Sequence, residues 1–273
     1  MYKNYLREIK ALFSSKNYPK SDLEDLVMHL LSINFTDLHT RVQLNNEQKN
    51  ALESMIDRRL NGEPVAHIIG YKEFLGRNFK VTSNTLIPRP ETEILVNEVI
   101  KRCQEKDSIK ILDIGTGTGC IIISIIKELE KLGHKASGIA IDISDGALEV
   151  AKHNAETLGM SDKIKFINCD VRKFRERDFN LVVSNPPYIP SSNIPLLETS
   201  VKDYEPHIAL DGGSDGLDFY RDIAKLASEI DCCILEFGIG QSEVILEIFN
   251  NFKEKKVIKD LKNIERVIIC ENS

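Results

Sequence analysis

The stretch ILDIGTGTGC, residues 111 to 120, joins a short apolar run to three glycines at alternate positions. Ile111, Leu112 and Ile114 are typical of a parallel strand that is buried on both faces. Glycines directly after such a strand allow a sharp turn and a close approach of the backbone to a ligand. The amino end of the helix that follows favours a carboxylate or a phosphate. The stretch therefore predicts a strand, loop and helix of a doubly wound α/β sheet, with a ligand site at the loop.

Alternating strand and helix patterns surround this stretch. Strands are expected at 109–114, 137–142, 164–168, 179–184 and 232–237, and helices are expected to start near residues 119, 145, 216 and 241. Two last apolar runs, at 255–259 and 266–270, have no helix between them and predict an antiparallel hairpin at one edge of the sheet. The sequence is thus expected to form a Rossmann-like sheet of seven strands.

Residues 1–62 carry a different pattern, in which apolar residues recur at helical spacing and predict a small helical bundle. Ser21 followed by Glu24 predicts a capping box for the second helix, and Gly62 predicts a left-handed end for the third. With 9 basic and 8 acidic side chains, the bundle is no polybasic arm, which favours a role in docking a protein partner. Residues 63–86 are rich in strand formers and are expected to form a β-hairpin linker to a third region, residues 87–273.

The overall composition narrows the class of protein. A chain of 273 residues that is 42% hydrophobic can bury a sizeable core, and it has no apolar run near the ~18 residues of a membrane span, so a cytoplasmic protein is expected. The net charge of -6 disfavours a broad nucleic-acid surface. The six cysteines include no C-x-x-C pair and the six histidines lack metal-ligand spacing, so reduced thiols and no metal are expected.

Acidic residues follow three successive strands of the predicted sheet. Asp113 precedes the glycine loop and suits an ammonium group, Asp142 suits two ribose hydroxyls, and Asp170 suits an adenine amino group. Together with a carboxylate at the helix end, these groups describe S-adenosylmethionine. A nicotinamide dinucleotide is the alternative, but its fingerprint expects Gly or Ala where this sequence has Cys120, which weakens that interpretation without excluding it.

The run VVSNPPYIP, residues 182 to 190, ends the fourth strand abruptly. An Asn before a proline is held extended, so Asn185 is expected to be stiff at the carboxyl end of its strand. The side-chain oxygen of Asn185 and the carbonyl of Pro186 can together accept both hydrogens of a planar NH2 group, and Tyr188 can stack on the group that carries it. Two other roles compete with substrate binding: Asn-Pro is a frequent turn opener, and a proline pair can serve as a polyproline ligand.

With these residues in view, the whole chain resembles the release factor glutamine methyltransferases of the PrmC/HemK family. The resemblance covers the helical N-terminal region and the segments PVAHIIGYKEF, LIPRPETE, ILDIGTGTG, SNPPYIP and ALDGGSDGLDFY. It implies a class I S-adenosylmethionine-dependent methyltransferase fold and transfer of a methyl group to the glutamine amide in the Gly-Gly-Gln loop of peptide chain release factors. NPPY alone is shared with enzymes that methylate exocyclic amines of nucleic-acid bases, which is the alternative function.

The resemblance also assigns site residues. The cofactor-binding set is expected to comprise Asp113, Gly115, Thr116, Gly117, Thr118, Gly119, Asp142, Asp170, Val171 and Asn185, and the substrate set Asn185, Pro186, Pro187 and Tyr188, with Asn185, Pro186 and Tyr188 catalytic. Members of the family often have an aromatic residue at the position of Val171, so stacking on adenine is in question here. The long loop 189–214 is expected to shape the approach for the partner. Arg89 is expected either to assist binding or to form a solvated ion pair.

Overall fold

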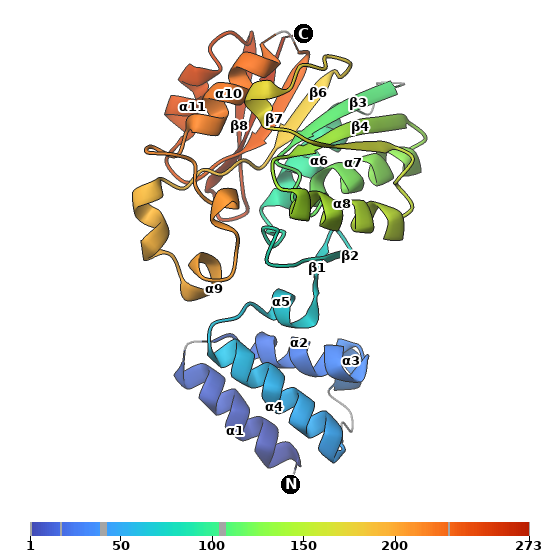
Figure 1. The fold of residues 1–273 in the computed structure, drawn as a ribbon, viewed down its shortest axis with the longest axis vertical. Helices are drawn as coiled ribbons and strands as arrows, with labels where there is room; N and C mark the ends of the chain where they lie inside the picture. The colour runs from blue at the N-terminus through green and yellow to red at the C-terminus, as the bar shows by residue number, and fades with distance from the viewer. Residues whose placement is uncertain (1, 17, 39–42, 104–107, 229, 273) are drawn as a thin grey trace. The chain divides into compact units, whose positions relative to one another are not determined.

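The computed structural model describes residues 2–16, 18–38, 43–103, 108–228 and 230–272, with side chains from residue 9 onward. The chain forms two compact units (Figure 1). The first comprises Met1–Tyr71 with Glu198–Tyr204, and the second comprises Lys72–Leu197 with Glu205–Ser273.

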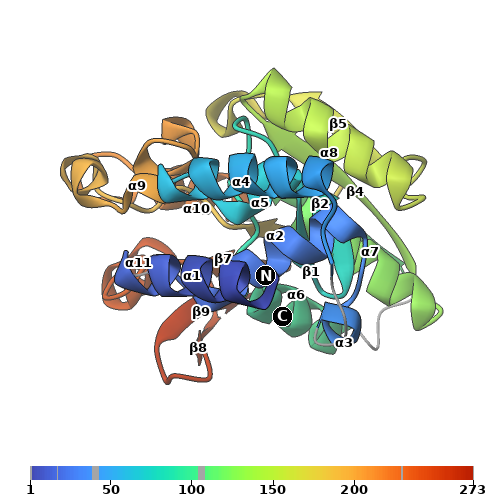
Figure 2. The same cartoon turned by 90° about the horizontal axis from the view of Figure 1, so that it is seen from below.

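The first unit is a helical bundle, as the apolar spacing predicts. Its helices are α1 (Tyr2–Ser15), α2 (Lys20–Leu31), α3 (Phe35–Leu38), α4 (Asn46–Leu60), α5 (Val65–Ile69) and α9 (Thr199–Lys202). Helix α2 packs against both α1 and α4 and is seen between them in Figure 2. Phe13, Leu23, Leu26 and Leu52 are fully buried at the centre of the bundle. The segment that carries α9 is held by Tyr204, whose hydroxyl donates a hydrogen bond of 3.2 Å to the carbonyl oxygen of Asn61.

The capping box expected at Ser21 is wrong. Helix α2 starts at Lys20, two residues earlier than an N-cap at Ser21 would place it, and the extended backbone of Pro19 serves as the N-cap without a side-chain hydrogen bond. A capping box is instead present at α4, where Asn45 Oδ1 accepts from Gln48 N at 2.8 Å and Gln48 Oε1 accepts from Asn45 N at 3.0 Å. The left-handed backbone expected at Gly62 is confirmed, with a φ of 101°.

The β-hairpin is shorter than the expected span of residues 63–86. It consists of β1 (Tyr71–Phe74) and β2 (Arg77–Lys80), while Val65–Ile69 forms helix α5 and not a strand. One turn of helix places Val65, Ile68 and Ile69 on a common face, and all three pack against the apolar core of the first unit. Burial of that face outweighs the strand preference of the β-branched residues.

The second unit is the predicted Rossmann-like sheet. Its strands are β3 (Ser108–Ile114), β4 (Lys135–Asp142), β5 (Ile164–Asn168), β6 (Leu181–Ser184), β7 (Cys232–Glu236), β8 (Glu254–Lys259) and β9 (Glu265–Glu271). The strand order is β5-β4-β3-β6-β7-β9-β8, with β9 antiparallel to both of its neighbours and the other pairs parallel. This order confirms the expected fold class, with the last hairpin antiparallel at one edge.

Helices cover both faces of the sheet (Figure 1). They are α6 (Thr92–Cys103), α7 (Cys120–Lys131), α8 (Asp145–Thr157), α10 (Asp218–Ala227) and α11 (Ser242–Ile248). Residues of β3 alternate between the two layers: Ile109 and Ile111 pack toward the side of α6 and α7, and Leu112 and Ile114 toward the side of α10 and α11. No helix in the described part of the chain is both long and apolar enough to cross a membrane.

The topology places a ligand site at the carboxyl ends of the central strands. Strand β3 pairs with β4 on one side and with β6 on the other, so the order of the strands reverses there. In doubly wound sheets, the crevice at the carboxyl ends of the strands on either side of this reversal is where ligands bind. The glycine loop follows β3 and Asn185 follows β6, which brings the two sequence motifs to this crevice.

Candidate active site

A cavity of about 500 Å³ opens at the carboxyl ends of β3, β4, β5 and β6. Ten of the residues expected in the site line it: Gly115, Thr116, Gly117, Thr118, Asp142, Asp170, Val171, Asn185, Pro186 and Pro187. Arg89 and Thr92 also line it. Asp113, Gly119 and Tyr188 are not among the lining residues of the described chain. The structure therefore brings most of the predicted site together and places three members behind the wall.

The glycine loop presents bare backbone to the cavity. Gly115 and Gly117 have φ values of 68° and 55°, and a Cβ atom at either position would have no atom closer than 4.0 Å. The loop is anchored from behind, because Gly115 N and Thr116 N donate to Ile141 O at 2.9 and 3.1 Å. A side chain at Gly115 or Gly117 would thus project into open space that a ligand can fill.

Gly119 has a different task, which is to allow close packing of the following helix. Its φ is 77°, and a Cβ atom there would lie 2.9 Å from Ile123 Cδ1 and 3.3 Å from Ala151 Cβ. Ala151 belongs to α8 and Ile123 to α7. The third glycine of the loop therefore holds α7 close to α8.

Asp142 ends β4 with a carboxylate that is fixed in orientation. Its Oδ2 accepts from Gly117 N at 3.0 Å, and its Oδ1 accepts from Ser144 N at 2.9 Å. Burial raises the pKa of Asp142, and the two backbone donors oppose that shift. Each oxygen keeps a further lone pair, so the carboxylate can accept a pair of hydroxyls from a ligand in the cavity.

Asp113 lies beneath the loop and is completely buried. Its Oδ2 accepts from Thr116 Oγ1 at 2.7 Å, and within the described residues its Oδ1 has no hydrogen-bond partner. Burial raises the pKa of Asp113 to about 7, which the hydrogen bond from Thr116 offsets only in part. Because Thr116 lines the cavity, Asp113 contacts the site through that hydroxyl.

Asp170 and Val171 follow β5 and form a further part of the wall. The Asp170 carboxylate accepts from the backbone of Arg172 at 2.9 Å and from its guanidinium, whose Nε lies 2.9 and 3.0 Å from the two oxygens. This arginine lowers the pKa of Asp170. Val171 is buried and offers an apolar surface to the cavity. Asp170 is thus already engaged by Arg172, and its remaining lone pairs are those available to a ligand.

Asn185 is tied back into the protein through its amide nitrogen. Its Nδ2 donates to Thr92 Oγ1 at 3.2 Å, and Thr92 Oγ1 donates to Glu236 Oε2 at 2.7 Å. Thr92 is the first residue of α6 and Glu236 the last residue of β7, and both are buried. Burial raises the pKa of Glu236 to about 7. Neither residue is in the expected site sets. Thr92 lies within the segment LIPRPETE, which carries part of the family resemblance, and Glu236 is signalled only by an acid at the end of the apolar strand CCILE.

Tyr188 lies behind the cavity, against the apolar layer on the side of α10 and α11. Its ring approaches Gly238 so closely that a Cβ atom on the glycine would lie 2.9 Å from Tyr188 Cδ2. Its carbonyl oxygen accepts from Gln241 Nε2 at 3.0 Å. Burial raises the pKa of the Tyr188 phenol to about 12, so the ring is neutral at physiological pH.

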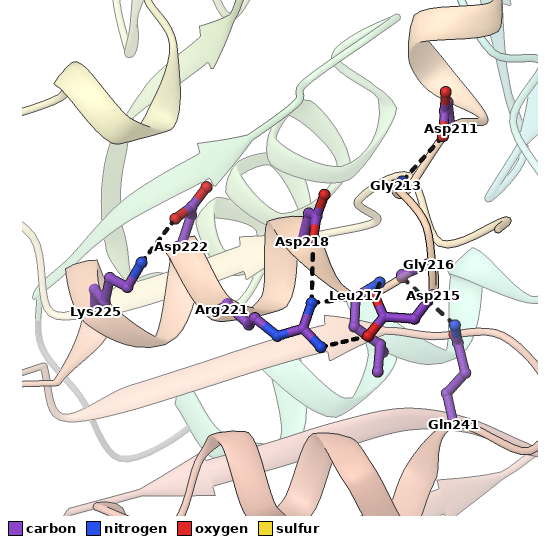
Figure 3. A network of polar contacts seen from close by, with 10 residues as sticks. All are labelled: Asp211, Gly213, Asp215, Gly216, Leu217, Asp218, Arg221, Asp222, Lys225 and Gln241. Atoms are coloured by element: carbon purple, nitrogen blue, oxygen red, sulfur yellow. Dashed lines mark hydrogen bonds and ion pairs between the residues drawn. The ribbon is translucent and has the colours of Figure 1, made fainter. Parts of the chain in front are cut away.

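The segment 189–214 contains short helices of its own. They are η2 (Ser191–Leu196), α9 and η3 (His207–Ala209), and a bridge between Ile189 and Asp211 closes its base. The polar turn that follows is shown in Figure 3, where Asp211 accepts from Gly213 N at 2.9 Å, and Arg221 contacts Asp215 and Asp218.

That turn packs directly on the backbone of the NPPY run. A Cβ atom on Gly216 would collide with Tyr188 O, and one on Gly212 would lie 2.8 Å from Pro187 O. Gln241 contacts both segments, since its Nε2 lies 3.5 Å from Gly216 O (Figure 3) as well as bonding Tyr188. The segment ALDGGSDGLDFY therefore buttresses the run that carries Asn185.

Arg89 forms an ion pair at the rim of the cavity, but the pair is not the solvated one that was expected, because its partner Glu205 is buried. Its guanidinium lies 2.5 Å from Glu205 Oε1, and Glu205 Oε2 accepts from Ile87 N at 3.0 Å. The Glu205 side chain is only 1% exposed, whereas that of Arg89 is 33% exposed. The pair fixes residues 87–89 next to the start of α6.

Over the described residues, no group of His, Cys, Asp and Glu side chains is arranged to hold a metal ion.

Two family models match the chain. The model of a methyltransferase domain matches residues 105–259, and that of the PrmC N-terminal domain matches residues 4–70. Proteins named release factor glutamine methyltransferase are similar over most of their length. That of Thermodesulfovibrio yellowstonii is 33% identical over 98% of this chain and 98% of its own, and that of Bradyrhizobium diazoefficiens is 34% identical over 96% and 92%. That of Geobacter sulfurreducens is 38% identical over 82% and 79%.

Solved structures match at lower identity. The hMettl16 catalytic domain in complex with the MAT2A 3'UTR hairpin 6 matches with a TM-score of 0.59 and 17% identity, over 88% of this chain and 87% of its own. The N-terminal domain of human METTL16 in complex with SAH matches with a TM-score of 0.52 and 18% identity, over 90% and 94%. At such identities the likeness concerns the fold alone.

Proposed function

Because this chain belongs to the release factor glutamine methyltransferases, which methylate a glutamine of release factors, we propose how its cavity serves that activity. The glycine loop and Asp142 bind S-adenosylmethionine, and Asn185 with Pro186 holds the side-chain amide of the substrate glutamine. The glutamine is that of the Gly-Gly-Gln loop of peptide chain release factors. The protein acts where those factors act, in the cytoplasm. The helical unit docks the partner.

The residues around the loop fit the proposed cofactor. When bound, S-adenosylmethionine supplies an electrophilic methyl group on a sulfonium centre. Gly115 and Gly117 leave room for a ligand against bare backbone, and the Asp142 oxygens are oriented to accept two hydroxyls. Val171 offers an apolar surface in place of an aromatic one. Asp113 supports this group from below through Thr116, and Gly119 through the packing of α7.

The substrate amide must be held because it is a poor nucleophile. The lone pair of an amide nitrogen is delocalised, so productive attack requires the nitrogen in line with the methyl group and drawn toward it by hydrogen-bond acceptors. Asn185 Oδ1 and the Pro186 carbonyl are two such acceptors for the two hydrogens of the NH2 group. Pro187 stiffens the run, and Tyr188 anchors it through its buried ring and its bond to Gln241. After transfer, the alkylated nitrogen is strongly acidic and gives its proton to water.

The observation that carries this assignment is the orientation of the Asn185 amide. Its nitrogen is occupied by Thr92, which leaves its oxygen as the acceptor on a wall shared with the glycine loop. Replacement Asn185→Ala is expected to lower methylation of a release factor at least ~100-fold, because one of two aligned acceptors is lost. Binding of S-adenosylmethionine, measured by calorimetry, should change little. Normal turnover in that variant would refute the clamp.

The product identifies the substrate residue. A release factor incubated with enzyme and S-adenosylmethionine is digested, and its peptides are mapped by mass. One added methyl group on the Gly-Gly-Gln glutamine is expected. Methylation elsewhere, or transfer to an RNA or DNA amine under the same conditions, would favour the alternative function. The cavity wall carries more carboxylates than cations, which disfavours a phosphate backbone there. Two guanidinium groups, those of Arg89 and Arg172, stand against five carboxylates: Asp142, Asp170, Asp211, Asp218 and Asp222.

A further inference from the structure

We propose that Thr92 and Glu236 form a positioning relay that fixes the direction of the Asn185 amide. The inference rests on the proposed clamp and deepens it, since both residues are argued to act through Asn185. An Asn side-chain amide has two nearly isosteric orientations, which exchange the positions of its oxygen and its nitrogen. Only the one with the oxygen toward the cavity accepts a hydrogen from the glutamine amide.

The single proton of the Thr92 hydroxyl decides between these orientations. Thr92 donates that proton to Glu236 Oε2 at 2.7 Å, so its oxygen offers Asn185 only lone pairs. A lone pair can be met by Nδ2 but not by Oδ1, and Nδ2 lies 3.2 Å from Thr92 Oγ1. The Asn185 oxygen is therefore left for the cavity. Without Glu236 as an acceptor, the Thr92 proton would be free to bind Oδ1 and would stabilise the reversed amide.

The surroundings of Glu236 are consistent with a dedicated role in this relay. Its carboxyl group is almost completely buried, at 2% exposure. Tyr220 donates to the backbone carbonyl of Glu236 at 2.8 Å, which secures the end of β7. Thr92 is equally buried, at 2% exposure, and begins α6, so its position is set by a helix. A buried carboxylate costs stability unless it is hydrogen-bonded, and Thr92 supplies that bond.

The test is a double-mutant cycle with Thr92→Val and Glu236→Met, which keep approximate volume. Thr92→Val removes the hydroxyl that selects the orientation of the Asn185 amide. Glu236→Met frees the Thr92 proton to bind Asn185 Oδ1 and so favours the reversed orientation. Each is expected to lower kcat for methylation of a release factor about 10- to 100-fold, as misplacement of a catalytic contact does. The affinity for S-adenosylmethionine should stay within about twofold. In the double variant, loss of Glu236 should add no further defect, because the hydroxyl that it directs is absent.

Rescue by a conservative change separates the hydroxyl from packing. Thr92→Ser retains the hydroxyl and is expected to keep kcat within about threefold of wild type, whereas Thr92→Val does not. Equal kcat for the Val and Ser variants, or additive defects in the double variant, would overturn the relay. Should Glu236→Met fail to fold, the Val and Ser pair decides alone. Loss of activity in Asn185→Ala with normal kcat in Thr92→Val would reject the relay and leave the clamp standing. Normal activity in Asn185→Ala would reject the clamp itself.

Discussion

Replacement of Asp113 by Asn should change the free energy of unfolding in a way that depends on pH. The difference between the variant and the wild type should favour the variant more at pH 8 than at pH 5. Asp113 is completely buried beneath the glycine loop, and burial raises its pKa to about 7 from an ordinary value of 3.8. Between pH 3.8 and about 7, the folded state therefore binds a proton that the unfolded state has released. Stability linked to Asp113 is fully present below pH 3.8 and is lost as the pH rises through 7.

The size of the effect follows from the difference between the two pKa values. About 3 pKa units at ~1.36 kcal/mol per unit correspond to roughly 4 kcal/mol, of which roughly 2.5 kcal/mol is expressed between pH 5 and pH 8. An Asn side chain has nearly the same shape and can still accept from Thr116, but it carries no charge at any pH. The free energy of unfolding of the variant should consequently not fall by this amount between pH 5 and pH 8.

Urea unfolding of both proteins at pH 5, 6, 7 and 8 measures the difference directly. The free energy of unfolding of Asp113→Asn minus that of wild type is expected to rise with pH across the series. Asp170→Asn is the matched control: Arg172 lowers the pKa of Asp170, so that residue keeps one charge state over this range and its variant should show a constant offset. A constant offset for Asp113→Asn as well would show that the buried carboxyl does not titrate in this window, and the reasoning would fail.

Two further substitutions test packing around the cavity. Gly119→Ala should cost at least ~2 kcal/mol of unfolding free energy, because it adds a collision with α7 and α8 to the strain of a left-handed backbone. Gly133→Ala is the control: its φ is 87° and the space around it is open, so it should cost about 1 kcal/mol. Equal losses in urea unfolding would refute the packing role of Gly119. Glu205→Gln should lower the free energy of unfolding by about 1.5 kcal/mol, because Arg89 loses a charged partner but is 33% exposed and can be solvated, and a double variant with Arg89→Gln should recover part of that loss.

The sheet could be predicted from sequence because its signals are local. Buried parallel strands give uninterrupted apolar runs, and the glycine loop marks the turn after β3, so strand order follows from the fold class. Residues 65–69 were mispredicted because their β-branched side chains favour a strand in isolation, while the core of the first unit rewards a single helical turn. The missed helix start at Lys20 has a similar origin, since Pro19 supplies the extended N-cap backbone without the side-chain oxygen that the prediction sought.

The front of the candidate site could also be predicted, but its support could not. Asn185 and Asp142 stand out because strand ends and prolines limit where their side chains lie. Thr92 precedes Asn185 by 93 residues and Glu236 by 144, and nothing in the local pattern of either partner reports the contact. Tyr188 was expected to face the substrate, yet a ring next to prolines is equally suited to a core, and only the packed structure shows its place against Gly238.

Two buried acids that do not line the cavity set the direction of two threonine hydroxyls on its wall. Asp113 and Glu236 each accept the proton of a threonine hydroxyl, and both threonines, Thr116 and Thr92, line the cavity. A hydroxyl that donates inward has only lone pairs left for what lies in front of it. At these two positions the wall therefore presents acceptors, which suits the ammonium group and ribose hydroxyls of the proposed cofactor and, through Asn185, the NH2 of the substrate amide. Burial of each acid costs stability, but it is also what allows the acid to direct a hydroxyl. An exposed carboxylate would accept hydrogen bonds from water and would not hold the threonine proton in one direction.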